Sequence, residues 1–337
     1  MRATLVLILL LFSACGKWVG TAHAASTAGR IESVDFSGKR YVRLEDWAKL
    51  NNFDIRWMGH DETLQLTNRS SRLVFNKDSR EAQLNGVNVC LSHPILLRNG
   101  GSYISKLDLE TAVHPLVWPP LNRSGAKVKT IVIDPGHGGK DPGFENGSHQ
   151  EKKYTLLLAQ ELCDQLKRAG FNASLTRTTD TKIELPERPD IARRRGADLF
   201  ISLHWNSVGG SKNEVKGVQT FCLTPPGASS SNAGGEIIDA GAKPGNLNNA
   251  KNMFLAYELQ KSLLKNLGTQ DRGVRRARFA VLCPAEMPAV LIEGGFMSHP
   301  TESKRIYDPA YRRDMARAIV EGVQDYKRQV EPARSGK

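Results

Sequence analysis

Three short apolar runs in this chain each lead into a side chain that can bind a metal ion or move a proton. The runs are residues 130–133, 198–203 and 288–292, and they lead to His137, His204 and Glu293 in that order. Runs of this kind, bounded by Gly and Pro and separated by helical stretches, predict buried strands. Ligands of an open α/β sheet bind beyond the carboxyl ends of its parallel strands. We therefore expect the three side chains to converge on one site.

The order of these elements predicts an α/β fold over residues 127–328, with a mostly parallel twisted sheet flanked by helices. Helices are expected over residues 151–169, 250–267 and 311–329. A proline pair followed by Ser-Gly predicts a linker over residues 118–126, and residues 329–337 form a tail. Residues 225–249, rich in Gly, Ser, Ala and Asn, interrupt the sheet pattern. We expect a surface loop there, with a lid or a partner-docking element as the alternative.

A smaller, β-rich α+β domain is predicted before the linker, over residues 29–117. Residues 39–50 and 101–110 read as two copies of one strand-then-helix unit, and Asn85-Gly86 predicts a hairpin turn between them. This region resembles the copper amine oxidase N-terminal-like repeat domain, which often accompanies bacterial cell-wall enzymes. Its sequence contains no cluster of ligands at metal spacing, so the resemblance does not predict copper binding.

The first residues have the pattern of an export signal. Arg2 precedes an apolar run over residues 3–12, and Ala22-His23-Ala24 supplies a small-x-small cleavage site. We therefore expect a signal peptide over residues 1–24, and the apolar run is too short to leave a transmembrane helix in the mature chain. The alternative is lipidation at Cys15, which ends a lipoprotein-like box. Either outcome places the mature protein in the periplasm or the cell wall.

Net charge indicates the class of binding partner, and cysteine spacing indicates whether a cysteine metal site is present. The formal net charge of +12 suits a polyanionic partner. No stripe of alternating aromatic and basic residues argues for nucleic acid, so cell-wall polymer or anionic lipid is the expected partner. The four cysteines that follow the leader lack C-x-x-C spacing, which argues against a cysteine zinc site and favours free thiols. They are Cys90, Cys163, Cys222 and Cys283.

The residue types at the three strand ends fit zinc catalysis. Zinc in hydrolases commonly has three protein ligands and a water molecule in the fourth position. His137 and His204 are the nitrogen ligands that the pattern offers. A third ligand should come from a nearby loop or helix start, and Glu151, Glu145 and His149 all satisfy that spacing. The spacing alone does not choose among them.

A zinc hydrolase also needs a group that removes and returns protons. Glu293 remains for this role once the ligands are assigned. Asp134 precedes the Gly-rich loop and is expected to orient His137 or to accept hydrogen bonds from loop amides. The loop lacks the Lys-Ser/Thr of a phosphate-binding P-loop, so nucleotide binding is not indicated.

These residues resemble the zinc-dependent N-acetylmuramoyl-L-alanine amidases of the amidase type 3 family. The resemblance covers about residues 127–328 and follows the order of the family's motifs. The matching segments are residues 131–143, Glu151-Lys152, Thr176-Arg177 with Asp180, Leu185 with Arg188, Ala197-Asp198, residues 202–206, Gly217-Val218, residues 272–274 and residues 293–299. One departure is His299, which stands where the family usually has Asn and which concerns substrate contacts more than the chemistry.

The resemblance implies a function and assigns roles. It implies that His137, Glu151 and His204 bind one Zn2+ ion per chain and that Glu293 is the catalytic carboxylate. It thereby selects Glu151 over its two competitors. It also implies hydrolysis of the amide bond between N-acetylmuramic acid and L-alanine in peptidoglycan.

Several further expectations follow. Asn206, Arg177 and Asp134 are candidates to contact substrate or to support a ligand. The small N-terminal domain is expected to position the enzyme on the wall or on a cell-envelope activator or anchoring partner. Two alternatives to the amidase are a zinc peptidase that acts on peptidoglycan stem peptides and a non-catalytic wall-binding protein.

Overall fold

The computed structural model describes residues 31–59, 62–98, 100–123, 125–209, 214–231 and 241–331. The predicted signal peptide and Cys15 lie outside these residues, as does most of the predicted tail. Within the described ranges, no helix is both long enough and apolar enough to cross a membrane.

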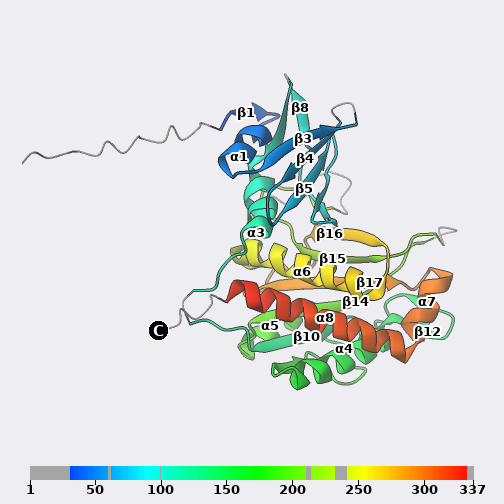
Figure 1. The fold of residues 1–337 in the computed structure, drawn as a ribbon. Coiled ribbons are helices and arrows are strands. Elements are labelled where there is room, and N and C mark those ends of the chain that lie inside the picture. Colours follow the sequence, from blue (N-terminus) through cyan, green and yellow to red (C-terminus); the bar gives the residue numbers. More distant parts are fainter. Residues whose placement is uncertain are drawn as a thin grey trace, which may run out of the picture.

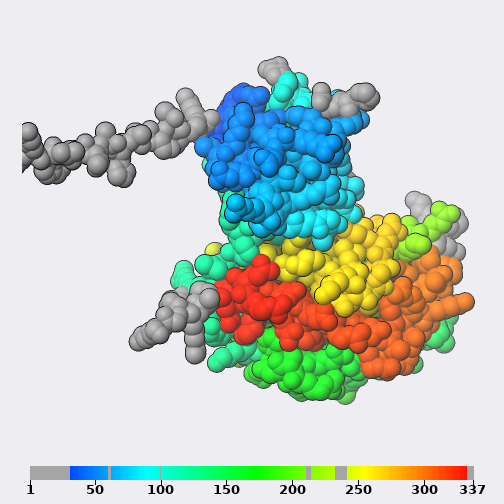
Figure 2. Space-filling view, in the orientation of Figure 1, coloured from blue at the N-terminus to red at the C-terminus, as the bar shows by residue number. Residues whose placement is uncertain are grey.

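A β-rich N-terminal unit precedes the predicted linker, and it forms a separate lobe above the larger unit in Figures 1 and 2. Its elements are β1 (Ser33–Phe36), β2 (Lys39–Arg43), α1 (Leu44–Leu50), β3 (Asp54–Met58), β4 (Thr63–Thr67), β5 (Arg72–Asn76), β6 (Glu81–Leu84), β7 (Val87–Cys90), β8 (Leu96–Arg98), β9 (Gly101–Ser105), α2 (Lys106–Asp108), the π-helix η1 (Leu109–Val113) and α3 (His114–Val117).

Local sequence explains the main turns of this unit. β2 leads directly into α1 and β9 leads directly into α2, as the repeated strand-then-helix pattern predicted. Asn85 and Gly86 join β6 to β7, with φ angles of 47° and 84°. Positive φ at both central residues is what a type I′ hairpin requires, and Asn-Gly is the sequence that adopts it most readily.

The larger unit has the α/β fold that the sequence predicted. Its elements are β10 (Thr130–Pro135), β11 (Glu145–Asn146), β12 (His149–Gln150), α4 (Glu151–Arg168), β13 (Asn172–Leu175), α5 (Glu187–Arg194), β14 (Leu199–Asn206), β15 (Val218–Leu223), the 3-10 helix η2 (Pro244–Asn248), α6 (Asn249–Leu267), β16 (Asp271–Ala277), β17 (Ala289–Phe296), α7 (Pro300–Tyr307) and α8 (Pro309–Val330). The three apolar runs form β10, β14 and β17, and these strands lie side by side and parallel.

Helices cover both faces of this sheet unequally. α4, α6 and α8 pack together on one face, where apolar side chains of the helices and strands form the main core (Figure 1). α5 and a smaller apolar cluster lie on the other face. Local signals set the ends of the helices. α8 begins at Pro309 after Asp308, whose side chain accepts a hydrogen bond from the backbone of Ala310. α6 ends at Leu267 and is followed by Gly268, which has a φ of 56°.

The two units share one sheet, which the sequence did not predict. The strand order is β13-β10-β14-β17-β15-β16-β7-β6-β5-β4-β3. The sheet is therefore mixed as a whole, although its β13-β10-β14-β17 part is parallel. The junction is between β16 and β7, where Val274 and Val89 are partners. Asn88 strengthens it, because its backbone N–H donates to Asp271 Oδ2 at 2.7 Å.

A buried ion pair also joins the two units. Arg276 in β16 donates to Asp108 Oδ1 at 3.1 Å, to Ser92 Oγ at 2.6 Å and to the Thr111 carbonyl at 2.8 Å. Arg276 is 2% exposed and Asp108 is fully buried. Because each charge is paired and hydrogen-bonded, the desolvation cost of burying them is offset only while both partners are present.

The described residues of the predicted loop, 225–231 and 241–249, lie away from the strand ends that carry His204 and Glu293. β15 runs antiparallel to β17, so the chain moves away from Glu293 as it passes along β15. The described residues of the loop follow that far end, and Asn248 Nδ2 donates to the Glu286 carbonyl at 2.9 Å, shortly before β17 begins. These residues therefore do not cover the predicted site.

Candidate metal centre and active site

The fold brings His137, His204 and Glu151 together at one end of the sheet. His137 follows β10, His204 lies near the end of β14, and Glu151 is the first residue of α4. Two glycines leave room for this convergence. A Cβ atom at Gly136 would lie 2.3 Å from Cε1 of His204, and one at Gly143 would lie 2.6 Å from Oε2 of Glu151. Any larger residue at either position would displace a member of the cluster.

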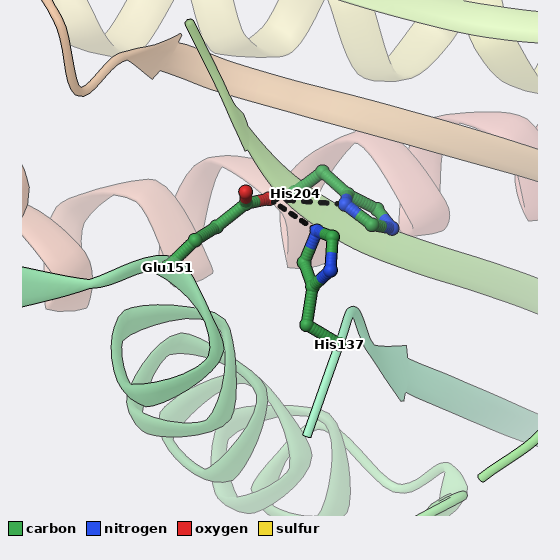
Figure 3. Close-up of side chains that lie close together, drawn as sticks. All are labelled: His137, Glu151 and His204. Carbon is green, nitrogen blue, oxygen red and sulfur yellow. Dashed lines mark hydrogen bonds and ion pairs between the residues drawn. The ribbon is translucent and has the colours of Figure 1, made fainter. Parts of the chain in front are cut away.

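One oxygen of Glu151 faces both imidazoles (Figure 3). Oε1 is 3.0 Å from Nδ1 of His204 and 3.2 Å from Nε2 of His137. The candidate ligand atoms of the three residues lie within 4.8 Å of one another. Glu151 is 5% exposed, and its two oxygens also accept hydrogen bonds from the backbone of Trp205 at 3.1 Å and of Phe144 at 3.0 Å. The backbone of two segments thus fixes the carboxylate in this orientation.

The electrostatics of the cluster favour a cation. Burial disfavours the charged form of Glu151, but hydrogen bonds from His137 and His204 outweigh burial and hold the pKa of its carboxyl far below the ordinary value. Burial also disfavours the imidazolium of His137, but hydrogen bonds to Glu151 and Asp141 outweigh it and raise its pKa. Both shifts arise because an anionic carboxylate attracts positive charge, so a metal cation placed among these atoms would be stabilised in the same way.

Glu293 lies beside this cluster on the neighbouring strand. It is the register partner of His204 in the parallel pair of β14 and β17, so the two side chains share a face of the sheet. Its Oε2 atom is shielded from solvent and has no hydrogen-bond partner among the described residues. Burial, and then the negative charge of Glu151, raise the pKa of Glu293 well above its ordinary value. A carboxyl with a raised pKa is suited to exchange protons near neutral pH.

Two buried arginines hold the loop that carries His137. Arg177 Nη2 donates to the Gly136 carbonyl at 2.7 Å, and Arg188 Nη2 donates to the His137 carbonyl at 2.8 Å. Each side chain is 3% exposed. The hydrogen bonds of Arg177 end on backbone carbonyls and a threonine hydroxyl of this chain, so its geometry fits support of the ligand loop better than contact with substrate.

Asp134 lies beneath the same loop and is fully buried. It accepts hydrogen bonds from Arg188 at 2.9 Å, from Thr176 Oγ1 at 2.7 Å and from Ser202 Oγ at 2.8 Å. It contacts neither the imidazole of His137 nor the loop amides that the sequence suggested. Arg188 connects Asp134 to His137, because it donates hydrogen bonds to the Asp134 carboxylate and to the His137 carbonyl.

Two of the residues that the family motif contains have local structural contacts. Asn206 Oδ1 accepts a hydrogen bond from the backbone of Ser207 at 2.7 Å, which stabilises the turn after β14. His299 caps α7, because its Nδ1 accepts hydrogen bonds from the backbone of Thr301 at 3.2 Å and of Glu302 at 3.3 Å. The imidazole thus makes the contact for which asparagine is favoured at a helix start.

The two competitors for the third ligand position lie outside the cluster. Glu145 is exposed and accepts a hydrogen bond from Gln150 Nε2 at 2.7 Å across the β11–β12 hairpin. His149 stacks on Tyr307, with ring centroids 3.8 Å apart. The hairpin therefore directs both side chains away from the imidazoles and leaves Glu151 facing them.

Sequence reasoning gave no role to two carboxylates that support the cluster. Asp141 Oδ2 is 2.8 Å from Nδ1 of His137. Asp180 accepts from the backbone of Gly139 at 2.7 Å and from Lys152 Nζ at 2.7 Å, and Lys152 also donates to the Gly139 carbonyl at 2.8 Å. Both residues belong to segments that match the family's motifs, and that match was the sequence feature that could have pointed to them. Asp141 is four residues after His137 in the same Gly-rich loop.

The chain is similar to a family of known proteins. The family described as N-acetylmuramoyl-L-alanine amidase matches residues 131–325. The chain is 34% identical to the amidase AmiA of Escherichia coli over 62% of its own length and 79% of that protein, and 33% identical to AmiC of Neisseria meningitidis over 65% and 57%. Among solved structures, the amidase AmiC2 of Nostoc punctiforme superposes with a TM-score of 0.50 and 31% identity, covering 60% of this chain and 98% of that one.

The matched range includes both histidines, Glu151 and Glu293. The larger unit of this chain has the mixed α/β fold of the superposed amidase. This chain therefore belongs to the N-acetylmuramoyl-L-alanine amidase family, whose activity is hydrolysis of the amide bond between N-acetylmuramic acid and L-alanine in peptidoglycan.

Proposed function

We propose that this amidase works with one zinc ion held by His137, Glu151 and His204, and that Glu293 is its catalytic acid and base. The observation that carries the proposal is the convergence of two imidazole nitrogens and one carboxylate oxygen within 4.8 Å. These donors come from three separate elements. Backbone hydrogen bonds orient Glu151, and Gly136 and Gly143 leave room for the side chains.

The donor set fits zinc. Zinc binds histidine nitrogen and carboxylate oxygen at about 2.0–2.2 Å, so the ligand atoms of a tetrahedral site lie roughly 3.3 Å apart. The distances of 3.0 and 3.2 Å from Glu151 Oε1 to the two imidazoles agree with that spacing. Three protein ligands leave a fourth position for water or substrate, as in catalytic zinc sites. When bound there, zinc lowers the pKa of a water molecule and polarises the scissile carbonyl.

Glu293 supplies the proton transfers in this proposal. Its carboxylate takes a proton from the attacking water and returns it to the nitrogen of L-alanine, the leaving group. Its unpaired Oε2 is the atom free to do so, and the raised pKa of Glu293 suits a group that must hold the proton between the two steps. Arg177 and Arg188 keep the His137 loop in place and take no part in the proton transfers.

The test is digestion of purified peptidoglycan by the chain with and without a chelator. We expect chelation to stop the release of stem peptides and added zinc to restore it. Mass spectrometry should find free L-alanine amino ends and intact glycan strands. Release of shorter peptide fragments would favour a peptidase, wall binding without release would favour a binding protein, and full activity in chelator would reject the zinc site.

We also propose that the protein is exported and acts in the periplasm or the cell wall, because its substrate lies outside the cytoplasm. The N-terminal unit would then position the enzyme on the wall or on an envelope partner. The mass of the mature chain, recovered from the envelope of its host, distinguishes cleavage after Ala24 from lipidation at Cys15. Recovery of uncleaved chain in the cytoplasm alone would contradict export.

A further inference from the structure

The side chain of Gln219, in β15, has no assigned role. It is 6% exposed, and no hydrogen bond joins its amide to another described residue. None of its atoms is among the described side-chain atoms that are both sealed from solvent and unpaired, so the amide reaches water. Gln260 in α6 is different, because its amide bonds to Thr220 Oγ1 at 2.9 Å, the Val218 carbonyl at 3.0 Å and Asp271 Oδ1 at 2.8 Å.

The register of the sheet puts Gln219 next to Glu293. The two residues are partners in the antiparallel pair of β15 and β17. Directly opposite residues share a face of the sheet, with Cβ atoms about 4.5–5.5 Å apart. Phe221 and Leu291, two positions further along, are also partners and lie in one apolar cluster, which agrees with a shared face. Since His204 is the partner of Glu293 on its other side, three adjacent strands carry His204, Glu293 and Gln219 in a row.

The chemistry of a primary amide matches the chemistry of the substrate. A glutamine side chain offers one acceptor oxygen and two N–H donors, so it can pair with both the N–H and the C=O of a secondary amide. A peptidoglycan strand carries secondary amides on both sides of the scissile bond. These are the acetamido group of the sugar and the next peptide bond of the stem.

We infer that Gln219 is a substrate-positioning residue that hydrogen-bonds a secondary amide of peptidoglycan next to the scissile bond. This inference rests on the proposed role of Glu293, since Gln219 is placed at the site by its register with that residue. A substrate-positioning role for Gln219 differs from a structural role in one respect. A structural amide stabilises the folded chain, as Gln260 does, whereas the side-chain amide of Gln219 has no hydrogen bond to a described residue that a substitution could remove.

The test compares Gln219→Leu with the matched control Gln260→Leu. With a soluble N-acetylmuramoyl peptide as substrate, we expect Gln219→Leu to lower kcat/KM about threefold to tenfold, the loss of one net hydrogen bond. The loss should appear mainly as a higher KM, because an interaction made equally in the ground and transition states affects binding. Zinc content and the urea midpoint should stay at wild-type values. Gln260→Leu should instead lower the urea midpoint.

Two trimmed substrates identify the partner amide. One lacks the acetyl group on the sugar, and the other ends at L-alanine. The ratio of wild-type to Gln219→Leu kcat/KM should fall to about one on the substrate that lacks the partner amide. A ratio of about one on the full substrate, or a ratio unchanged by both trims, would overturn the inference.

The experiment still tests the role of Gln219 if Gln219→Leu does not fold or if the proposed role of Glu293 is wrong. If Gln219→Leu does not fold, Gln219→Met keeps the length and flexibility of the side chain without its amide, and the same ratios apply. A stable, fully active Glu293→Gln variant would reject the acid and base role of Glu293. It would leave the Gln219 measurement intact, because that measurement is made with Glu293 present.

Discussion

Asp141 and Glu151 contact opposite nitrogens of one imidazole: Asp141 Oδ2 is 2.8 Å from Nδ1 of His137, and Glu151 Oε1 is 3.2 Å from Nε2. A carboxylate that accepts the Nδ1 proton fixes the tautomer in which Nε2 is free to bind a metal. His137 has a φ of 61°, which is uncommon for a residue other than glycine, and the contact with Asp141 helps to hold its imidazole in this loop.

Asp141→Asn should therefore weaken zinc binding. Loss of a carboxylate behind a histidine ligand typically costs about tenfold to a hundredfold in metal affinity. Titration against a competing chelator measures the change directly. Asp190→Asn is the control and should bind zinc as the wild type does, because Asp190 is partly exposed and its ion pairs among the described residues are with Arg193 and Arg194 of its own helix, α5. Equal affinities of both variants would show that Asp141 does not support His137.

Glu293→Gln should separate metal binding from turnover. The variant keeps the shape of the side chain but cannot take up a proton, so we expect kcat to fall at least about a hundredfold. Zinc content should not change, because the three proposed ligands remain. The exposed Glu286, just before β17, gives the control Glu286→Gln, which should keep full activity. Turnover near the wild-type rate would assign the proton transfers to another group.

Arg276→Met should destabilise the protein strongly. Removing one partner of a buried ion pair leaves the other charge uncompensated, which typically costs about 3–5 kcal/mol. The variant leaves Asp108 buried without its cation at the junction of the two units. Urea unfolding should show a lower midpoint, or a first transition that reports separation of the N-terminal unit. Arg275→Met, the neighbouring position with no ion pair among the described residues, should cost much less.

The ion pair of Asp180 and Lys152 should make a small, pH-dependent contribution. Hydrogen bonds from Lys152 and from the Gly139 backbone lower the pKa of Asp180 below its ordinary 3.8. Stability from this group is therefore fully present above pH 3.8 and is lost as the pH falls through the lower, folded-state pKa.

Because Asp180 is largely exposed, the effect should stay below about 1 kcal/mol. Unfolding free energies of wild type and Asp180→Asn should differ by that amount at pH 7 and converge as the pH falls below the folded-state pKa of Asp180. A difference that grows on acidification would contradict the assigned sign.

The sequence predicted the parts of the site that follow from local pattern. Strands β10, β14 and β17 were readable because each is a short apolar run, and parallel strands place their carboxyl ends together. The third ligand was not readable from spacing. Glu145, His149 and Glu151 lie within seven residues, and the β11–β12 hairpin determines which of them faces the histidines. The choice of Glu151 as a ligand came from resemblance to a family, and the fold puts its carboxylate beside both imidazoles.

Contacts between distant residues could not be read from the chain. The pairing of Val89 with Val274 joins segments far apart in sequence, and neither strand carries a pattern that names its partner. Gln219 was part of a strand that looked ordinary, and only its register with Glu293 draws attention to it. Asp141 lay inside a recognised motif, but i and i+4 spacing in a loop does not show which side chains touch.

The junction of β16 and β7 has a consequence for truncation. A fragment that starts at the linker would turn β16 into an edge strand, with unpaired backbone groups that a second copy could bind. It would also expose the guanidinium of Arg276 without its carboxylate. Isolated catalytic fragments of this protein should therefore self-associate more readily than the whole chain.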